Sequence, residues 1–567
     1  MITAIKSYII FALTFFLIDL DFAKEYKDII LRWPSVNIVS AILKIKGFEI
    51  NDYFTNNILE TPLRVIINLF SLLLPKDHLQ LVSIYSIYSL FIKSFLPVLL
   101  IFLASCITTL LHKKVVNNRM ILNYQSQFLK IFFIGNIIFY LSKQSDNLKL
   151  LFFGVNIADW GFPNALASSR GISLFISISS LVIPLLFEIF EVNINKIEKY
   201  LYITLFLINL IASLIHPISP IISLIILIFI ILLINETQIN FKLILLVNFI
   251  SWCFGLLIIF FNFPQESIDN MSLFTIYIKD SHSHHYLPSA YFLKFFNNIF
   301  PIILNYLISI FFIFYYRKSN TKKEIFTNLF IFFNTIIFII NSIQYLFVEL
   351  LKNQLFMKLG LTFANITYNF IYFVSFLLFI SLISINKKKI EFKEFHKIRD
   401  YPLINTKILN LTFLIFIIST FILTINVHQL NIKKVKNSLS YNLGEKISFF
   451  DNNKYEFIID KKLEGSLLYP REIALINIFS DNYFPFKQDV LKDWRERSMH
   501  LNNFRNCINS SVKNKCYLPD SYKKYLLYVS DEKQTKLGEE IFNKEINGNN
   551  IHINLIKKTK SITEHFK

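Results

Sequence analysis

The chain has 567 residues, of which 54% are hydrophobic and 17% are charged, and its formal net charge is +19. A soluble domain carries about 25% charged residues, so this composition argues against a soluble protein and favours one with many membrane spans. The abundance of Phe, Ile, Lys and Asn indicates an AT-rich coding sequence, which makes the basic excess weak evidence for nucleic-acid binding. We expect these charges to face membrane lipid, and no nucleic-acid partner is predicted.

Apolar stretches of roughly 20 residues, the length that crosses ~30 Å of hydrocarbon, recur along the chain. They predict about eleven spans, at 3–20, 84–111, 122–142, 171–190, 200–215, 217–234, 243–262, 291–316, 325–345, 362–385 and 408–426. No small-residue cleavage site follows the N-terminal run, so we expect an uncleaved first span. The spans contain few charged residues, which argues against an ion- or proton-coupled transporter.

The loops between these spans alternate in charge. The short, basic loops, which the positive-inside rule places in the cytoplasm, are 112–119, 195–199, 317–324 and 386–399. The longer, less basic segments, which we expect to face outward, are 21–83, 143–170, 216–220, 263–290, 346–361 and the chain after 427. The predicted architecture is therefore an α-helical polytopic membrane domain over 1–427, with its N-terminus inside, and an extracytoplasmic α/β domain over 428–567.

The C-terminal region has the composition and patterning of a small α/β unit. GSLLYP, ALINIFS, KYLLYVSD and NIHINLI predict strands, and KQDVLKDWRERSMHLNNF predicts a helix. Cys507 and Cys516 lie nine residues apart in this region, where an oxidising compartment would join them in a disulfide; two unpaired thiols are the alternative. No CxxC pair or zinc spacing occurs, so the cysteines predict no metal site.

Carboxylates in the long first outer loop (21–83) and at its start are the candidates for a general base. Asp19 and Asp21 fall where the first span ends, and Asp52 follows in GFEINDYF. A carboxylate beside an apolar surface loses hydration, which raises its pKa and lets it take a proton from a hydroxyl group. The alternative is that these acidic side chains only solvate an external loop.

The second outer loop contains Asp159, Trp160 and Arg170 within FFGVNIADWGFPNALASSRG. Trp160 beside acidic and basic groups suits a sugar ring. Arg170, at the mouth of a span, suits a lipid phosphate because a guanidinium group matches phosphate oxygens in pairs. An interfacial aromatic anchor and a boundary charge are the alternatives.

Residues 279–290, KDSHSHHYLPSA, gather His282, His284 and His285 between two apolar segments. Three histidines this close bind one zinc ion only with an unusual backbone, and structural zinc sites need four ligands. Together with Lys279 they suit a phosphate better, because these groups donate hydrogen bonds to a leaving group. A solvated loop is the alternative, and dependence on a divalent metal stays open.

Two stretches together resemble an uncharacterised family of bacterial multi-spanning membrane proteins. They are HSHHYLPSAYF, with its paired histidines and proline, and NIFSDNYFPFKQDVLKDWRERS, with its Trp-x-x-Arg helix. ADWGFPNALASS and SLIHPISPIISLII fit the same order and spacing. That family is distantly similar to the lipid-dependent glycosyltransferases of the C superfamily. The resemblance implies transfer of a sugar from a polyprenyl-phosphate donor at the outer face of the bacterial cytoplasmic membrane.

The resemblance also implies roles for individual residues. Asp52 resembles an aspartate of the family's first loop, with Asp19 and Asp21 as competitors. The other matching residues are His284, His285, Pro288, Trp494 and Arg497. The family's basic residue just ahead of the paired histidines is missing, and Lys279 is the nearest substitute. A polysaccharide or lipid transporter or flippase, and a non-catalytic scaffold for cell-envelope assembly, are the alternative functions. The sequence leaves the sugar, the acceptor and the oligomeric state open.

Overall fold

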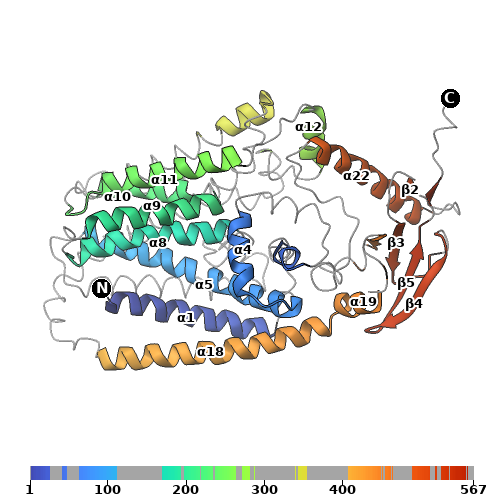
Figure 1. Cartoon of the computed structure of the whole chain (residues 1–567), viewed down its shortest axis with the longest axis horizontal. Helices are drawn as coiled ribbons and strands as arrows, with labels where there is room; N and C mark the ends of the chain where they lie inside the picture. The colour runs from blue at the N-terminus through green and yellow to red at the C-terminus, as the bar shows by residue number, and fades with distance from the viewer. Residues whose placement is uncertain are drawn as a thin grey trace, which may run out of the picture. The chain divides into compact units, whose positions relative to one another are not determined.

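The computed structural model describes residues 2–25, 41–47, 63–111, 169–192, 197–216, 219–233, 237–262, 271–280, 287, 339, 342–353, 406–447, 450, 454–460, 463, 488–510, 518–519, 525–534, 537–556 and 558–559. Figure 1 shows the elements with the labels used below. The chain forms two compact units. The helical unit comprises Met1–Asp19, Leu90–Phe261 and His282–Ile422, and the sheet-containing unit comprises Leu20–Ser89, Asn262–Ser281 and Leu423–Lys567.

Five described helices are long and apolar enough to cross a membrane. They are α5 (His78–Leu111), α8 (Ser169–Ile189), α9 (Glu198–Ile215), α11 (Phe241–Asn262) and α18 (Thr406–Lys436). Two further apolar helices, α1 (Ile2–Glu25) and α10 (Ser219–Leu233), also coincide with predicted spans. The predicted spans 122–142, 291–316 and 362–385 lie outside the described residues, and 325–345 lies almost wholly outside them, ahead of a π-helical turn, η4 (Tyr345–Leu350).

The directions of α8, α9 and α11 are those that consecutive membrane crossings require. Ser173 Oγ, near the start of α8, donates a hydrogen bond to Ala212 O near the end of α9, at 2.7 Å. At the other end, the buried Glu188 carboxylate of α8 accepts the Ile239 N–H just ahead of α11, at 2.9 Å. Thus α8 runs antiparallel to both α9 and α11, as expected if successive spans alternate in direction.

A few buried polar side chains link α8, α9 and α11, whose outer surface is apolar. Asn209 Nδ2 of α9 donates to Ser180 Oγ of α8 at 3.1 Å and to Asn248 Oδ1 of α11 at 2.8 Å. The exposed apolar side chains of α9 and α11 include Ile203, Leu207, Ile211, Leu246, Phe249, Phe254 and Leu257. Hydrogen-bonded polar groups between helices and an apolar outer surface are typical of helices packed in lipid. This polarity supports a membrane location for the unit.

The sheet-containing unit includes a small four-stranded mixed sheet with the order β1-β3-β5-β4. Its strands are β1 (Tyr455–Ile459), β3 (Tyr525–Ser530), β4 (Glu540–Ile546) and β5 (Asn549–Leu555), and a separate parallel pair joins β2 (Leu518–Pro519) to β6 (Lys558–Thr559). β1 pairs with β3 in parallel, so a crossover must connect them; α22 (Gln488–Asn509) lies in it. β5 is antiparallel to both β3 and β4.

Helices cover the two faces of this sheet. The alternation of side chains along β3 sends Leu526 and Tyr528 to one face, where they pack with Leu501 and Phe504 of α22. The opposite face packs against Leu443 and its neighbours on α19 (Leu439–Ile447). The coarse prediction of a small C-terminal domain with helices and strands is therefore confirmed.

The local predictions for this region are partly confirmed. KYLLYVSD and NIHINLI form β3 and β5, and KQDVLKDWRERSMHLNNF lies in α22. GSLLYP and ALINIFS lie outside the described residues. β1 and β4 were not predicted. The predicted domain boundary at 427/428 falls inside α18, which continues to Lys436 as one helix.

Candidate functional site

The candidate site begins where α12 (Met271–Asp280) packs on α22, inside the sheet-containing unit. The Tyr277 ring meets the Trp494 ring edge to face, with centroids 4.9 Å apart, and both side chains are fully buried. Arg495 Nη1 donates to Asp280 Oδ2 at 3.1 Å. That ion pair is partly exposed and contributes about 0.2–1 kcal/mol, so the buried aromatic pair supplies most of the attachment. We call this contact the α12–α22 junction.

Arg497, the arginine of the Trp-x-x-Arg pattern, connects α22 to the sheet. Its Nε lies 3.0 Å from Asp493 Oδ2 one helical turn earlier, and its Nη1 lies 3.7 Å from Glu456 Oε2 on β1. All three side chains are largely buried in this position. Trp494 therefore holds α12 while Arg497 holds β1, and the structure gives both residues an architectural role.

The junction determines where the histidine segment starts. Lys279 is exposed in the last turn of α12, beside Asp280. His282, His284 and His285 follow within five residues of the end of α12, and they lie outside the described residues. Within the segment 263–290, which the charge pattern predicts to face outward, the structure has the short helix α12.

The acidic and basic candidates elsewhere are only partly described. Asp21 is exposed on α1, and Asp19 lies on the same helix. Arg170 is the second residue of α8. The candidates Asp52, Asp159 and Trp160 lie outside the described residues, so their predicted convergence with the histidines stays a prediction.

Two of the six segments that the charge pattern predicts to face outward, and part of a third, belong to one compact unit. The first outer loop lies within Leu20–Ser89, the α12 segment is Asn262–Ser281, and the C-terminal region starts at Leu423. These segments are far apart in sequence, whereas the chain from His282 to Ile422 is grouped with the helical unit.

The cysteines divide into two classes. Cys507, on α22, forms a disulfide, whereas Cys106 and Cys253 on the apolar helices are free. The predicted partner Cys516 lies outside the described residues. Within the described part of the chain, no group of three His, Cys, Asp or Glu side chains is arranged to hold a metal ion.

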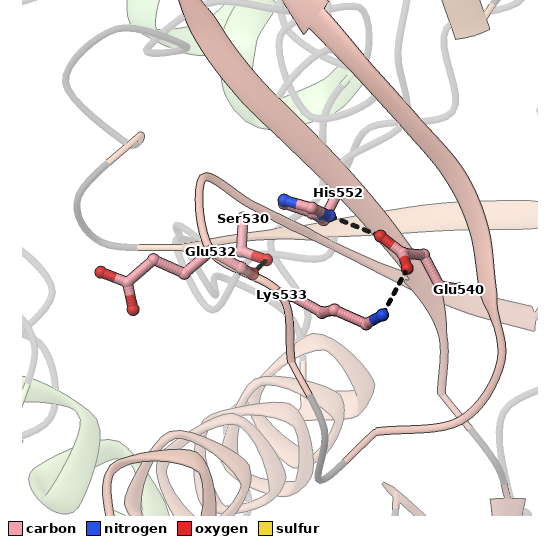
Figure 2. A network of polar contacts seen from close by, with 5 residues as sticks. All are labelled: Ser530, Glu532, Lys533, Glu540 and His552. Atoms are coloured by element: carbon pink, nitrogen blue, oxygen red, sulfur yellow. Dashed lines mark hydrogen bonds and ion pairs between the residues drawn. The ribbon is translucent and has the colours of Figure 1, made fainter.

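A second polar cluster, which the sequence analysis missed, lies on the sheet (Figure 2). The Glu540 carboxylate is hydrogen-bonded to His552 Nδ1 and lies 3.7 Å from Lys533 Nζ. The hydrogen bond from His552 is the main reason that the pKa of Glu540 is lowered. Ser530 pairs with His552 across β3 and β5, but its hydroxyl donates to Glu532 O at 2.7 Å. The Ser530 hydroxyl group thus donates its hydrogen bond within its own turn.

Turn chemistry offers the signal that predicts part of this cluster. Asn547 and Gly548 both have positive φ, at 53° and 76°, and they join β4 to β5 in a two-residue hairpin turn. Asn-Gly is the strongest short sequence signal for such a turn. The Asn547-Gly548 pair therefore predicts a strand ahead of β5, which is β4, and the pairing of Asn543 with His552.

Comparisons with protein-family models, with curated proteins and with solved structures find no match to this chain.

Proposed function

We propose that this chain is an integral membrane glycosyltransferase-like protein that takes a sugar from a polyprenyl-phosphate donor at the outer face of the bacterial cytoplasmic membrane. The observation that carries the proposal is the α12–α22 junction, in which Tyr277 of α12, the helix just ahead of the histidine stretch, packs on Trp494 of the C-terminal domain. Trp494 belongs to one of the two stretches on which the family resemblance rests, and the other stretch, 282–292, begins two residues after the end of α12. The closeness of α12 to that stretch along the chain supports a common role.

In the proposed reaction, the carboxylate of Asp52, or of Asp21, takes the proton of an acceptor hydroxyl group. The hydroxyl oxygen then forms a bond to the anomeric carbon as the bond from that carbon to the lipid phosphate breaks. His284, His285 and Arg170 donate hydrogen bonds to the departing phosphate, which stabilises its developing charge. The C-terminal domain binds the acceptor, and the membrane holds the polyprenyl tail.

The test is transfer from a polyprenyl-phosphate sugar by the full-length protein in lipid vesicles. Asp52 and Asp21 are each replaced by Asn. The variant that lacks the general base is expected to transfer the sugar about 10²–10⁴-fold more slowly, which is the usual contribution of a general base. Asp489→Asn is the matched control because Asp489 is an exposed carboxylate on α22. Full activity in both the Asp52 and Asp21 variants would sink the assignment.

One observation bears on the alternative of a transporter or flippase, which needs polar groups along a passage through the membrane. The buried Asn209, Ser180 and Asn248 are polar groups between α8, α9 and α11. They bond to one another, however, as side chains do that hold helices together in lipid. They therefore support helix packing, and the transferase remains our proposal.

A further inference from the structure

Helix α4 (Leu63–Leu73), in the predicted first outer loop, has an apolar face that points to the surface. Leu69, Leu72 and Leu73 are 60%, 82% and 84% exposed. Their spacing of three and four residues places them together on one side of the helix. Ile67 and Ser71 are buried and face the opposite side. Three neighbouring leucines this exposed form an apolar patch of the kind that marks a membrane or partner contact.

The exposed leucines belong to a helix that is held firmly on its other side. Ile67 packs in a buried cluster with Ile42, Leu79, Val82 and Val435. Lys46 Nζ donates to the carbonyl oxygens of Ser71 and Leu74, at 2.5 and 2.8 Å. A cation on these carbonyls satisfies the otherwise unpaired C-terminal end of the helix and complements its dipole. The orientation of the leucines is thus set by packing and capping.

Helix α4 is also tied closely to a membrane-spanning candidate. Asp77 Oδ1 accepts the Gln80 N–H at 2.9 Å and caps α5, whose apolar stretch begins at Leu79. The five residues 74–78 between Leu73 and Leu79 reach at most ~20 Å, at ~3.3–3.6 Å per residue. Helix α4 therefore cannot lie far from the point where α5 enters the membrane.

Basic side chains accompany this apolar face. Arg64 on α4 and Lys76 in the linker to α5 are exposed. The last turn of α18, whose Val435 packs in the same cluster as Ile67, adds the exposed Lys433 and Lys436. Basic residues at the edge of a membrane attract the phosphates of anionic lipids. Apolar and basic groups together are the pattern of a helix that lies in the membrane interface.

We propose that α4 is an interfacial anchor, which inserts Leu69, Leu72 and Leu73 among lipid acyl chains and holds lipid phosphates with the neighbouring basic residues. The partner is the lipid bilayer itself. This role is independent of the proposed transfer reaction, so the two can fail separately.

The test uses the full-length protein with the photo-crosslinking residue p-benzoylphenylalanine in place of Leu72, reconstituted in vesicles of phosphatidylethanolamine and phosphatidylglycerol. Irradiation is expected to raise the intact mass by one phospholipid. The same substitution at Leu73 should behave alike. At Lys533, which is 67% exposed in the connection between β3 and β4, it should give no lipid adduct. Exposed positions are chosen because their substitution leaves the packed face of α4 intact.

Other products would overturn the proposal. A crosslinked dimer would assign the leucines to an interface between two copies of the chain. A crosslink within one chain would show that another segment covers them, and an unreacted probe would place them in water. Exchange of phosphatidylglycerol for phosphatidylcholine should lower the adduct yield; an unchanged yield would refute the contact between the basic residues and anionic headgroups.

Discussion

At the scale of single residues, ion pairs on the C-terminal sheet depend on one irregularity of the backbone. Counting from the Asn547-Gly548 turn in a regular ladder would place Ile541 opposite Asn554, with Glu540 on the other face. A β-bulge shifts the register between Glu540 and Phe542, so Glu540 stands opposite Asn554, where its carboxylate reaches His552. Bulges often redirect a side chain in this way. The turn is readable in the sequence, but the bulge depends on packing across the sheet.

This ion pair predicts a pH dependence of local stability. Because the pKa of Glu540 is lowered from its ordinary value of 4.5 in the folded protein, its contribution is present above that value and is lost as the pH falls below it. Glu540→Gln should therefore reduce hydrogen-exchange protection of β4 and β5 at pH 7, and the difference from the unmodified protein should shrink as the pH falls below 4.5 and through the lowered pKa of Glu540. Glu545→Gln, an exposed change on the same strand, is the control. A difference that persists at low pH would contradict the prediction.

At the scale of elements, the length of an apolar stretch predicts a long helix well, but it does not predict which other element the helix packs against. The long helices α5, α8, α9 and α11 follow from stretches of the right length. Short helices such as α4 and α12 do not, since eleven and ten residues are marginal in isolation and become stable only through tertiary packing. The α12–α22 junction likewise requires Tyr277 and Trp494 to meet across more than two hundred residues of chain, which no local pattern encodes.

The junction predicts how α12 is stabilised. Trp494→Ala removes a fully buried ring and should destabilise the contact by about 3–5 kcal/mol, the usual cost of such a truncation. The expected result is a loss of hydrogen-exchange protection in 271–280 of the full-length protein. Trp494→Phe keeps an aromatic ring against Tyr277 and should retain most of that protection. Equal loss in both variants would show that the edge-to-face contact is not what holds α12.

At the scale of the whole molecule, the composition alone predicts the apolar helices, because a chain this poor in charge cannot cover a soluble surface. The grouping of Leu20–Ser89, Asn262–Ser281 and Leu423–Lys567 in one unit does not follow from the alternation of basic loops, which predicts an outward position for parts of both units. The identity of the interhelical contacts does not follow from hydropathy, since Ser and Asn in an apolar stretch look alike whether they face lipid or a neighbouring helix.

The buried Asn209 cluster predicts a contribution to the stability of the helical unit. Asn209→Leu breaks hydrogen bonds to both Ser180 and Asn248. Hydrogen bonds between membrane helices contribute about 0.6 kcal/mol on average and at most about 1.7 kcal/mol, so the midpoint of thermal unfolding in detergent should fall by a few degrees. Leu207→Ala on the exposed face of the same helix is the control and should change little. An Asn209→Leu variant as stable as the control would refute this role.

The attachment of α12 to α22 has a consequence for the segment that follows it. His282 is two residues beyond Asp280, so its backbone cannot be more than ~7 Å from an anchored point. A tether of two residues confines its end to a small volume around the end of α12. The Tyr277–Trp494 contact thus limits where the next segment can start, and loss of that contact would enlarge this volume without any change in the sequence of the segment.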